Sequence, residues 1–131
     1  MSRPLKVQIV ERARELVADE QNWCQRHLAQ DVNGASVSPT STAAVKRCGL
    51  GAVIAAAYQL THDYDAAHRL GHEALRPHYS PATLIYLNDI RGHTAVLALL
   101  PRDRKRLFLR VRTHRVTTMR TIRTLRLNTR A

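Results

Sequence analysis

Residues 48–58 have the sequence Cys-Gly-Leu-Gly-Ala-Val-Ile-Ala-Ala-Ala-Tyr, in which nearly every side chain is apolar or small. A helix that is apolar on all its faces is normally buried, so this stretch predicts a central helix. The Ser38-Pro39 pair is typical of an N-cap followed by a proline in the first turn, which predicts that the helix runs from there to about Leu60. The longest apolar run, Leu50 to Leu60, is too short to span a bilayer.

Further helices are expected around this central one. Apolar residues at helical spacing predict an amphipathic helix over about residues 4–20, and residues 30–41 have the composition of a loop. Asp63 or Asp65 can cap a third helix that ends at Pro77, and residues 94–100 form a fourth apolar helical segment.

Leu84 to Leu87 predicts a short strand or a buried loop, followed by Asn88-Asp89 as a turn or a helix cap. The predicted fold is therefore all-α: a compact bundle of about four short helices within residues 1–100.

Charge divides the chain at about residue 100. The full net charge is +11, but residues 1–100 carry a balance of only +1. Residues 101–131 hold eleven Lys and Arg against Asp103 alone, a balance of +10. Such a block is normally a solvated interaction segment, so we expect a second region, a basic extension, over residues 101–131.

The basic extension is the best candidate for contact with a partner. Phosphate attraction needs only cations within reach, so we expect nucleic acid binding without sequence preference. Phe108 is the one aromatic residue of the extension, which disfavours base stacking of the single-strand type. An anionic membrane surface and an incidental fused segment, suggested by three Thr-apolar-Arg triplets in residues 118–126, are the alternatives. The candidate nucleic-acid-binding residues are Arg102, Arg104, Lys105, Arg106, Arg110, Arg112, Arg115, Arg120, Arg123 and Arg126.

An ordered set of landmarks lies in the first hundred residues: Trp23, Ala29, Asp31, Gly34, Cys48, Gly51-Ala52 and Asn88-Asp89. In this order they resemble a family of small uncharacterised bacterial and phage helical proteins, known only as a domain of unknown function. The resemblance covers roughly residues 5–100 and implies no activity.

These landmarks also supply candidates for a ligand site. If Asp31, Asn88 and Asp89 converge on Trp23, with Cys48 nearby, they would form a small polar pocket with one aromatic wall. The simpler interpretation is that Asp31 shapes a turn and that Asn88 or Asp89 caps a helix.

Cysteines and histidines are the remaining candidates for chemistry. Cys24, His27 and Cys48 could bind zinc, or a thiolate beside His27 could act as a nucleophile, but cysteine is also commonly buried as a small apolar residue. His68 and His72 lie one helical turn apart, a spacing that can ligate a metal, and Asp65 on the same side could be a third ligand or support them. We favour core positions for the cysteines and an exposed polar face for the histidines, and we expect no metal and no cofactor.

The sequence thus favours a non-enzymatic helical binding or accessory domain with a polybasic segment able to contact nucleic acid. The alternative is a small ligand-binding protein or enzyme that uses Trp23, Asp31, Asn88 and Asp89. Residues 1–6 contain no apolar signal region, so we expect a cytoplasmic location with both cysteines as free thiols.

Overall fold

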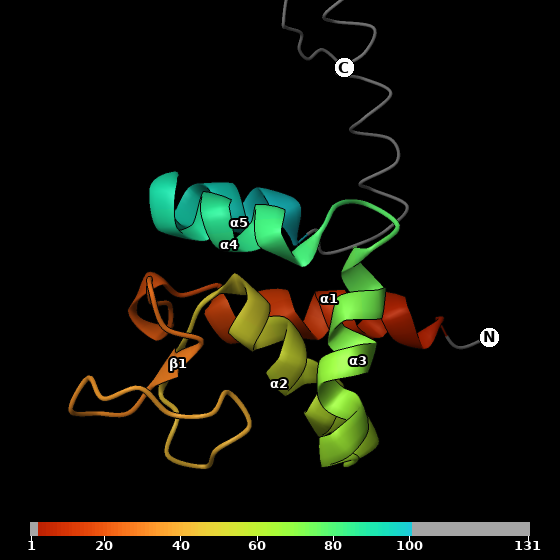
Figure 1. Cartoon of the computed structure of the whole chain (residues 1–131), viewed down its shortest axis with the longest axis horizontal. Coiled ribbons are helices and arrows are strands. Elements are labelled where there is room, and N and C mark those ends of the chain that lie inside the picture. The colour runs from red at the N-terminus through yellow and green to blue at the C-terminus, as the bar shows by residue number, and fades with distance from the viewer. Residues whose placement is uncertain (1–2, 101–131) are drawn as a thin grey trace, which may run out of the picture. The chain divides into compact units, whose positions relative to one another are not determined.

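A computed structural model describes residues 3–100, and within this range the protein is mostly helical (Figure 1). Five α-helices, one short 3-10 helix and two very short strands follow one another along the described part of the chain. The predicted basic extension, residues 101–131, lies outside the described residues. Within residues 3–100, no helix combines the length and apolar character needed to cross a membrane.

Helix α2, Gly49–Thr61, is the buried centre of the domain, and the prediction of a central helix is confirmed. Every residue from Gly49 to Ala57 is buried. The helix begins ten residues later than Ser38-Pro39 suggested, because Ser38 shapes a turn instead: its carbonyl accepts from the amide of Ser41. The actual N-cap is Cys48, whose sulfur accepts from the amide of Gly51 at 3.3 Å.

Helix α1, Leu5–Val17, packs along α2 through the buried side chains Ile9, Ala13 and Val17. Its spacing follows the amphipathic pattern, so the prediction of an N-terminal helix is confirmed. The helix stops at Val17, and a 3-10 turn, η1, Glu20–Asn22, follows with Asp19 as its cap. The amide of Gln21 donates to the Asp19 carboxylate at 2.9 Å.

Two strands of two residues each join the segments that precede α2. Strand β1, Ala29–Gln30, pairs antiparallel with β2, Lys46–Arg47, with Ala29 opposite Arg47. A separate parallel bridge joins Trp23 to Arg47. The all-α prediction is therefore incomplete, because strands this short show no alternating pattern in the sequence.

Helix α3, Tyr64–Leu75, packs against α2 and is capped by Asp63, one of the two caps expected from the sequence. The Asp63 carboxylate accepts from the amide of Ala66 at 3.0 Å. Gly71 lets the two helices approach closely, since an added Cβ would lie 3.2 Å from the side chain of Val53.

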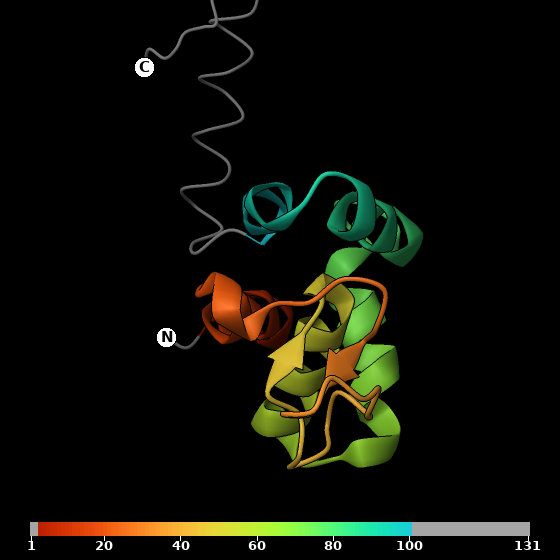
Figure 2. The same cartoon turned by 90° about the vertical axis from the view of Figure 1, so that its left-hand side faces the viewer.

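Helices α4, Pro81–Ile90, and α5, His93–Leu99, lie side by side across the domain (Figures 1 and 2). The prediction of a strand or buried loop at Leu84–Leu87 is wrong, because these residues belong to α4. Ser80 caps this helix and Pro81 occupies its first turn. Asn88 and Asp89 consequently lie in the last turn of α4 and do not cap α5, whose N-cap is Gly92.

We expect that residues 1–103 fold without the remaining residues. The core closes at buried Leu100, and the guanidinium of Arg14 donates to the carbonyl of that residue at 2.9 Å. A chain ending at Asp103 should unfold cooperatively, with a melting temperature within about 5 °C of the full chain, or roughly 1 kcal/mol. Circular dichroism during heating tests this, and loss of the cooperative transition would show that later residues complete the core.

Candidate functional site

Asn88 is the one fully buried polar side chain among the described residues, and it lies where three segments meet. Its Oδ1 accepts from the indole Nε1 of Trp23 at 2.7 Å and from the amide of Gly49 at 2.9 Å. Its Nδ2 donates to the carbonyl of Cys24 at 3.1 Å and to Oδ1 of Asp89 at 3.0 Å. An asparagine amide offers two acceptor and two donor positions, so all four are filled by the protein itself.

The neighbouring Asp89 holds the turn that follows Trp23. Its Oδ1 accepts from the amide of Arg26 at 3.0 Å, and Arg26 adopts a left-handed backbone with φ of 67°. Gln25 supports the same junction, because its Nε2 donates to the carbonyls of Asn88 and Asp89 at 3.1 and 3.2 Å. The turn at residues 24–27 is therefore fastened to the C-terminal end of α4.

Trp23 is half-buried and packs against His93, the first residue of α5, with ring centroids 5.3 Å apart. The Nε2 of His93 lies 2.7 Å from the carbonyl of Val17, at the end of α1. We call Trp23, Cys24, Gly49, Asn88 and Asp89 the Asn88 cluster. It joins Trp23 and the 24–27 turn to α2 and α4, and His93 extends this junction to α1 and α5.

Asp31 forms its hydrogen bonds within its own loop. Its Oδ1 accepts from the amides of Asn33 and Ala35, each at 2.9 Å. Gly34 completes this loop with φ of 85°, a conformation that favours glycine. Of the five residues proposed for a pocket, Trp23, Asn88 and Asp89 are joined by hydrogen bonds, whereas Asp31 shapes a turn.

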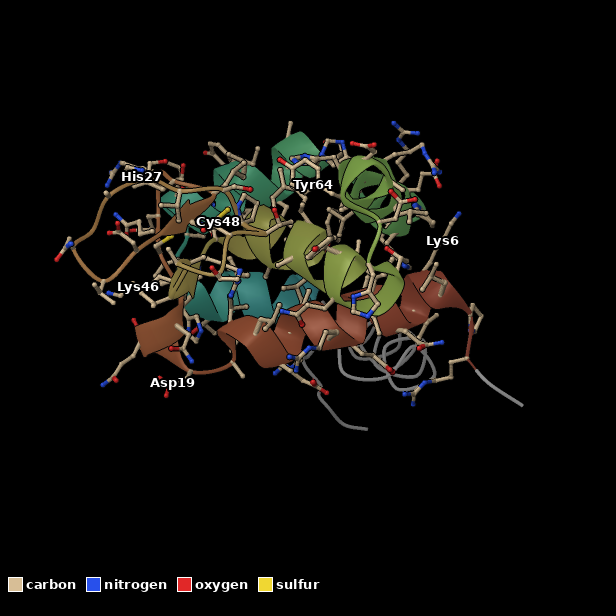
Figure 3. All side chains as sticks on the ribbon, turned by 90° about the horizontal axis from the view of Figure 1, so that it is seen from below. Lys6, Asp19, His27, Lys46, Cys48 and Tyr64 are labelled. Atoms are coloured by element: carbon tan, nitrogen blue, oxygen red, sulfur yellow. The ribbon has the colours of Figure 1, made fainter. Side chains whose placement is uncertain are left out.

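Cys48 lies beside the cluster as the N-cap of α2, and Figure 3 shows it toward the same end of the domain as His27 and Lys46. The start of a helix leaves backbone amides without partners, but two of them are paired here. The amide of Gly49 donates to Asn88, and the amide of Gly51 donates to the sulfur of Cys48. The carbonyl of Leu28 accepts from the amide of Cys48 at 3.1 Å. Its oxygen also lies against the backbone of Gly51, where there is no room for a side chain. An anion would therefore have to displace bonds that the protein already makes.

The five residues of the cluster and the glycines at the start of α2 fall within the part of the chain that a known family model covers. The model of the family of unknown function DUF6197 matches residues 1–103. The chain belongs to DUF6197. No curated protein and no solved structure matched it. The match ends close to the point where the basic extension begins.

The cysteines of this DUF6197 domain are both buried, as the core interpretation predicted. The thiol of Cys24 donates to the backbone carbonyl of His27 at 3.5 Å. Among residues 3–100, no three His, Cys, Asp or Glu side chains gather in a way that could hold a metal ion. Of the two histidines predicted to lie on an exposed face of α3, His68 is exposed, whereas His72 is half-buried.

Burial also sets the protonation of these thiols. It is the main reason that the pKa of Cys24 rises from 9.0 to about 11, and the charge interaction with Cys48 contributes to the same rise. Burial likewise raises the pKa of Cys48, although the amide of Gly51 opposes this effect. Both groups are thiols at neutral pH, whereas nucleophilic catalysis requires the thiolate.

The raised thiol pKa values predict a loss of stability in alkaline solution. The unfolded chain releases the Cys24 proton near pH 9, whereas the folded chain holds it to about pH 11. The contribution of Cys24 to the free energy of unfolding is therefore constant below about pH 9 and falls between about pH 9 and pH 11. The loss due to Cys24 should reach about 1 kcal/mol by pH 10. Urea unfolding at several pH values measures it.

The Cys24→Ser variant is the control, and its curve should fall less steeply above pH 9. Cys48 and Tyr79 retain part of the slope in this variant, because burial raises the pKa of both side chains. Identical slopes for the two proteins would contradict the assignment to Cys24.

Sequence reasoning did not identify Gln25, Gly49 or His93 as parts of this junction. Gln25 and His93 carry no local signal, because their partners lie 63 and 76 residues away. Gly49 contributes its backbone amide, which any residue type has.

Proposed function

We propose that this DUF6197 protein is a non-enzymatic binding or accessory module, whose residues 101–131 contact nucleic acid without sequence preference. The observation that carries the proposal is the charge balance of +10 in those residues, against +1 in residues 1–100. Arginine supplies most of this charge, and its guanidinium forms bidentate hydrogen bonds with phosphate. Lack of sequence preference is expected because contacts to phosphate carry no sequence information. Phe108 is the only aromatic residue within residues 101–131, so base stacking contributes little.

The described domain supports the non-enzymatic part of the proposal. The four hydrogen-bonding positions of buried Asn88 are filled by Trp23, Cys24, Gly49 and Asp89. These contacts join segments that are distant in the sequence, so they stabilise the fold. The raised pKa values of both thiols also make them weak nucleophiles at neutral pH.

One observation favours the alternative, a ligand-binding protein or enzyme: Trp23, Asn88 and Asp89 are in direct contact. A ligand would have to compete with the bonds inside this group, and Asp31 would have to leave its own loop. We therefore assign the group a structural role in the proposal. From the sequence alone, we also propose that the family is of bacterial and phage origin and that the protein is located in the cytoplasm.

Salt dependence of binding tests the proposed function. If about five cations of the extension contact phosphates, the logarithm of the affinity for duplex DNA should fall against the logarithm of salt concentration with a slope near −4 to −5. Replacing Arg120, Arg123 and Arg126 with Gln in the full chain should flatten this slope by up to about three. Fluorescence anisotropy of labelled duplexes with unrelated sequences measures slope and preference together.

A matched control changes the same number of charges in the folded domain. Lys6, Arg69 and Arg76 are exposed there, and their replacement with Gln should change the slope by less than about one. Equal effects of the two triple variants would contradict a specific role for the extension. Strong discrimination between duplex sequences, or no binding at low salt, would overturn the proposal itself.

A further inference from the structure

Two segments bring the only two cysteines of the chain into neighbouring positions. Trp23 and Arg47 form a parallel bridge, and the amide of Cys24 donates to the carbonyl of Arg47 at 3.1 Å. The next pair in this register is Cys24 and Cys48. The backbone is extended on both sides, with φ and ψ of −115° and 147° at Trp23 and of −80° and 177° at Cys48.

The register fits the requirements of a disulfide. Paired strands lie about 4.8 Å apart, and residues in register point to the same face. Disulfides join residues whose Cα atoms are usually about 4.4–6.8 Å apart. Because the Trp23–Arg47 bridge precedes them directly, this register places Cys24 and Cys48 at about the separation that a disulfide requires.

Both side chains also enter the same buried region. Cys24 is 6% and Cys48 is 5% exposed, and both belong to the continuous apolar core. The two sulfurs are close enough that a charge on Cys48 contributes to the raised pKa of Cys24. The side chains are thus neighbours in the core, and their backbones are neighbours across the paired segments.

We propose that Cys24 and Cys48 form a reversible intramolecular disulfide, for which a small-molecule disulfide is the oxidant. One protein thiolate attacks the small disulfide and forms a mixed disulfide, which releases the first small thiol. The second protein thiolate then attacks the protein sulfur of this mixed disulfide and releases the second small thiol. The protein loses two electrons and two protons, and the small disulfide is reduced to two thiols.

The disulfide would fasten the loop before α2 to the start of that helix. The Cys48 sulfur remains able to accept from the amide of Gly51, so the cap of α2 is kept. The Cys24 sulfur loses its proton and with it the hydrogen bond to the carbonyl of His27. Oxidation therefore exchanges one weak contact for a covalent link that encloses residues 24–48.

Burial governs how fast this reaction proceeds. Because both thiols are shielded and protonated, exchange requires a local opening of the 24–27 turn. We therefore expect slow formation and slow reduction of a stable bond.

Equilibration of the full chain with mixtures of reduced and oxidised glutathione tests the proposal. Acid quenching, alkylation of free thiols and mass spectrometry give the fraction that carries the internal disulfide, in native buffer and in urea. The equilibrium constant for oxidation should be at least about 30-fold larger in native buffer, because a disulfide that fits the fold stabilises it. The oxidised chain should also melt about 10 °C higher than the reduced chain.

The Cys24→Ser variant is the chemical control, since it can form only a mixed disulfide with glutathione. If this variant does not fold, the comparison of the unaltered chain in buffer and in urea still decides the matter. An equilibrium constant no larger in buffer than in urea would overturn the proposal. Accumulation of mixed disulfides or covalent dimers of the unaltered chain would overturn it as well.

Discussion

Replacing Gly51 with alanine is expected to lower the free energy of unfolding by about 3 kcal/mol or more, the upper range for an overfilled core. A Cβ at this position would lie 1.9 Å from the carbonyl oxygen of Leu28, far inside van der Waals contact. That carbonyl also accepts from the amide of Cys48, so moving it aside breaks a buried hydrogen bond. Urea denaturation followed by circular dichroism and by the fluorescence of Trp23 measures the loss.

The Gly71→Ala variant is a matched control within a neighbouring helix. Its added Cβ would lie 3.2 Å from a side-chain carbon of Val53, a mild crowding that costs stability, whereas alanine favours the helix by about 1 kcal/mol. These effects oppose each other, so stability should change by no more than about 1 kcal/mol. A loss in Gly51→Ala as small as that of the control would show that the 28–29 backbone can move away at little cost.

Replacing Asn88 with alanine is expected to cost about 4 kcal/mol. The change leaves the buried Gly49 amide and Cys24 carbonyl without their partner, and each unsatisfied buried group costs about 1–3 kcal/mol. The half-buried Trp23 indole also loses its acceptor. The emission of Trp23, the only tryptophan in the chain, should shift to longer wavelength as its surroundings open. Denaturant titration and emission spectra of the folded protein provide the two measurements.

Asn33→Ala serves as the control, because Asn33 is exposed in the 31–35 loop. Its stability should stay within about 0.5 kcal/mol of the unaltered chain. A loss below about 1 kcal/mol for Asn88→Ala would contradict the structural role assigned to the Asn88 cluster and would favour the ligand-site alternative.

The sequence predicted the features that depend on composition and on helical periodicity. The apolar run after Cys48 predicted a buried central helix, and the spacing of Ile9, Ala13 and Val17 predicted the first one. Asp63 was recognised as one of two possible caps because capping is a local interaction. The charge difference beyond residue 100 is likewise evident from residue types alone.

Features that depend on partners distant in the sequence could not be found in this way. Asn88 was expected to serve the helix that follows it, but it accepts from Gly49, the first residue of α2, 39 residues earlier. The two strands likewise pair residues 16 and 18 positions apart. Helix α4 is different: Ser80-Pro81 is a local start signal, and the short apolar run at Leu84–Leu87 obscured it.

The contacts at the ends of α1 and α5 bear on the synthesis of the protein. Arg14 donates to the carbonyl of Leu100, and His93 reaches the carbonyl of Val17, so the first helix and the last described one hold each other. A chain is synthesised from its N-terminus, so α1 is made first. The bonds to His93 and Leu100 can form only after residue 100 has emerged from the ribosome. The apolar face of α1 packs on α2 and α3, so it is covered earlier, once residues 49–75 have emerged. Until then this face is open, and in that period the nascent chain needs protection from aggregation.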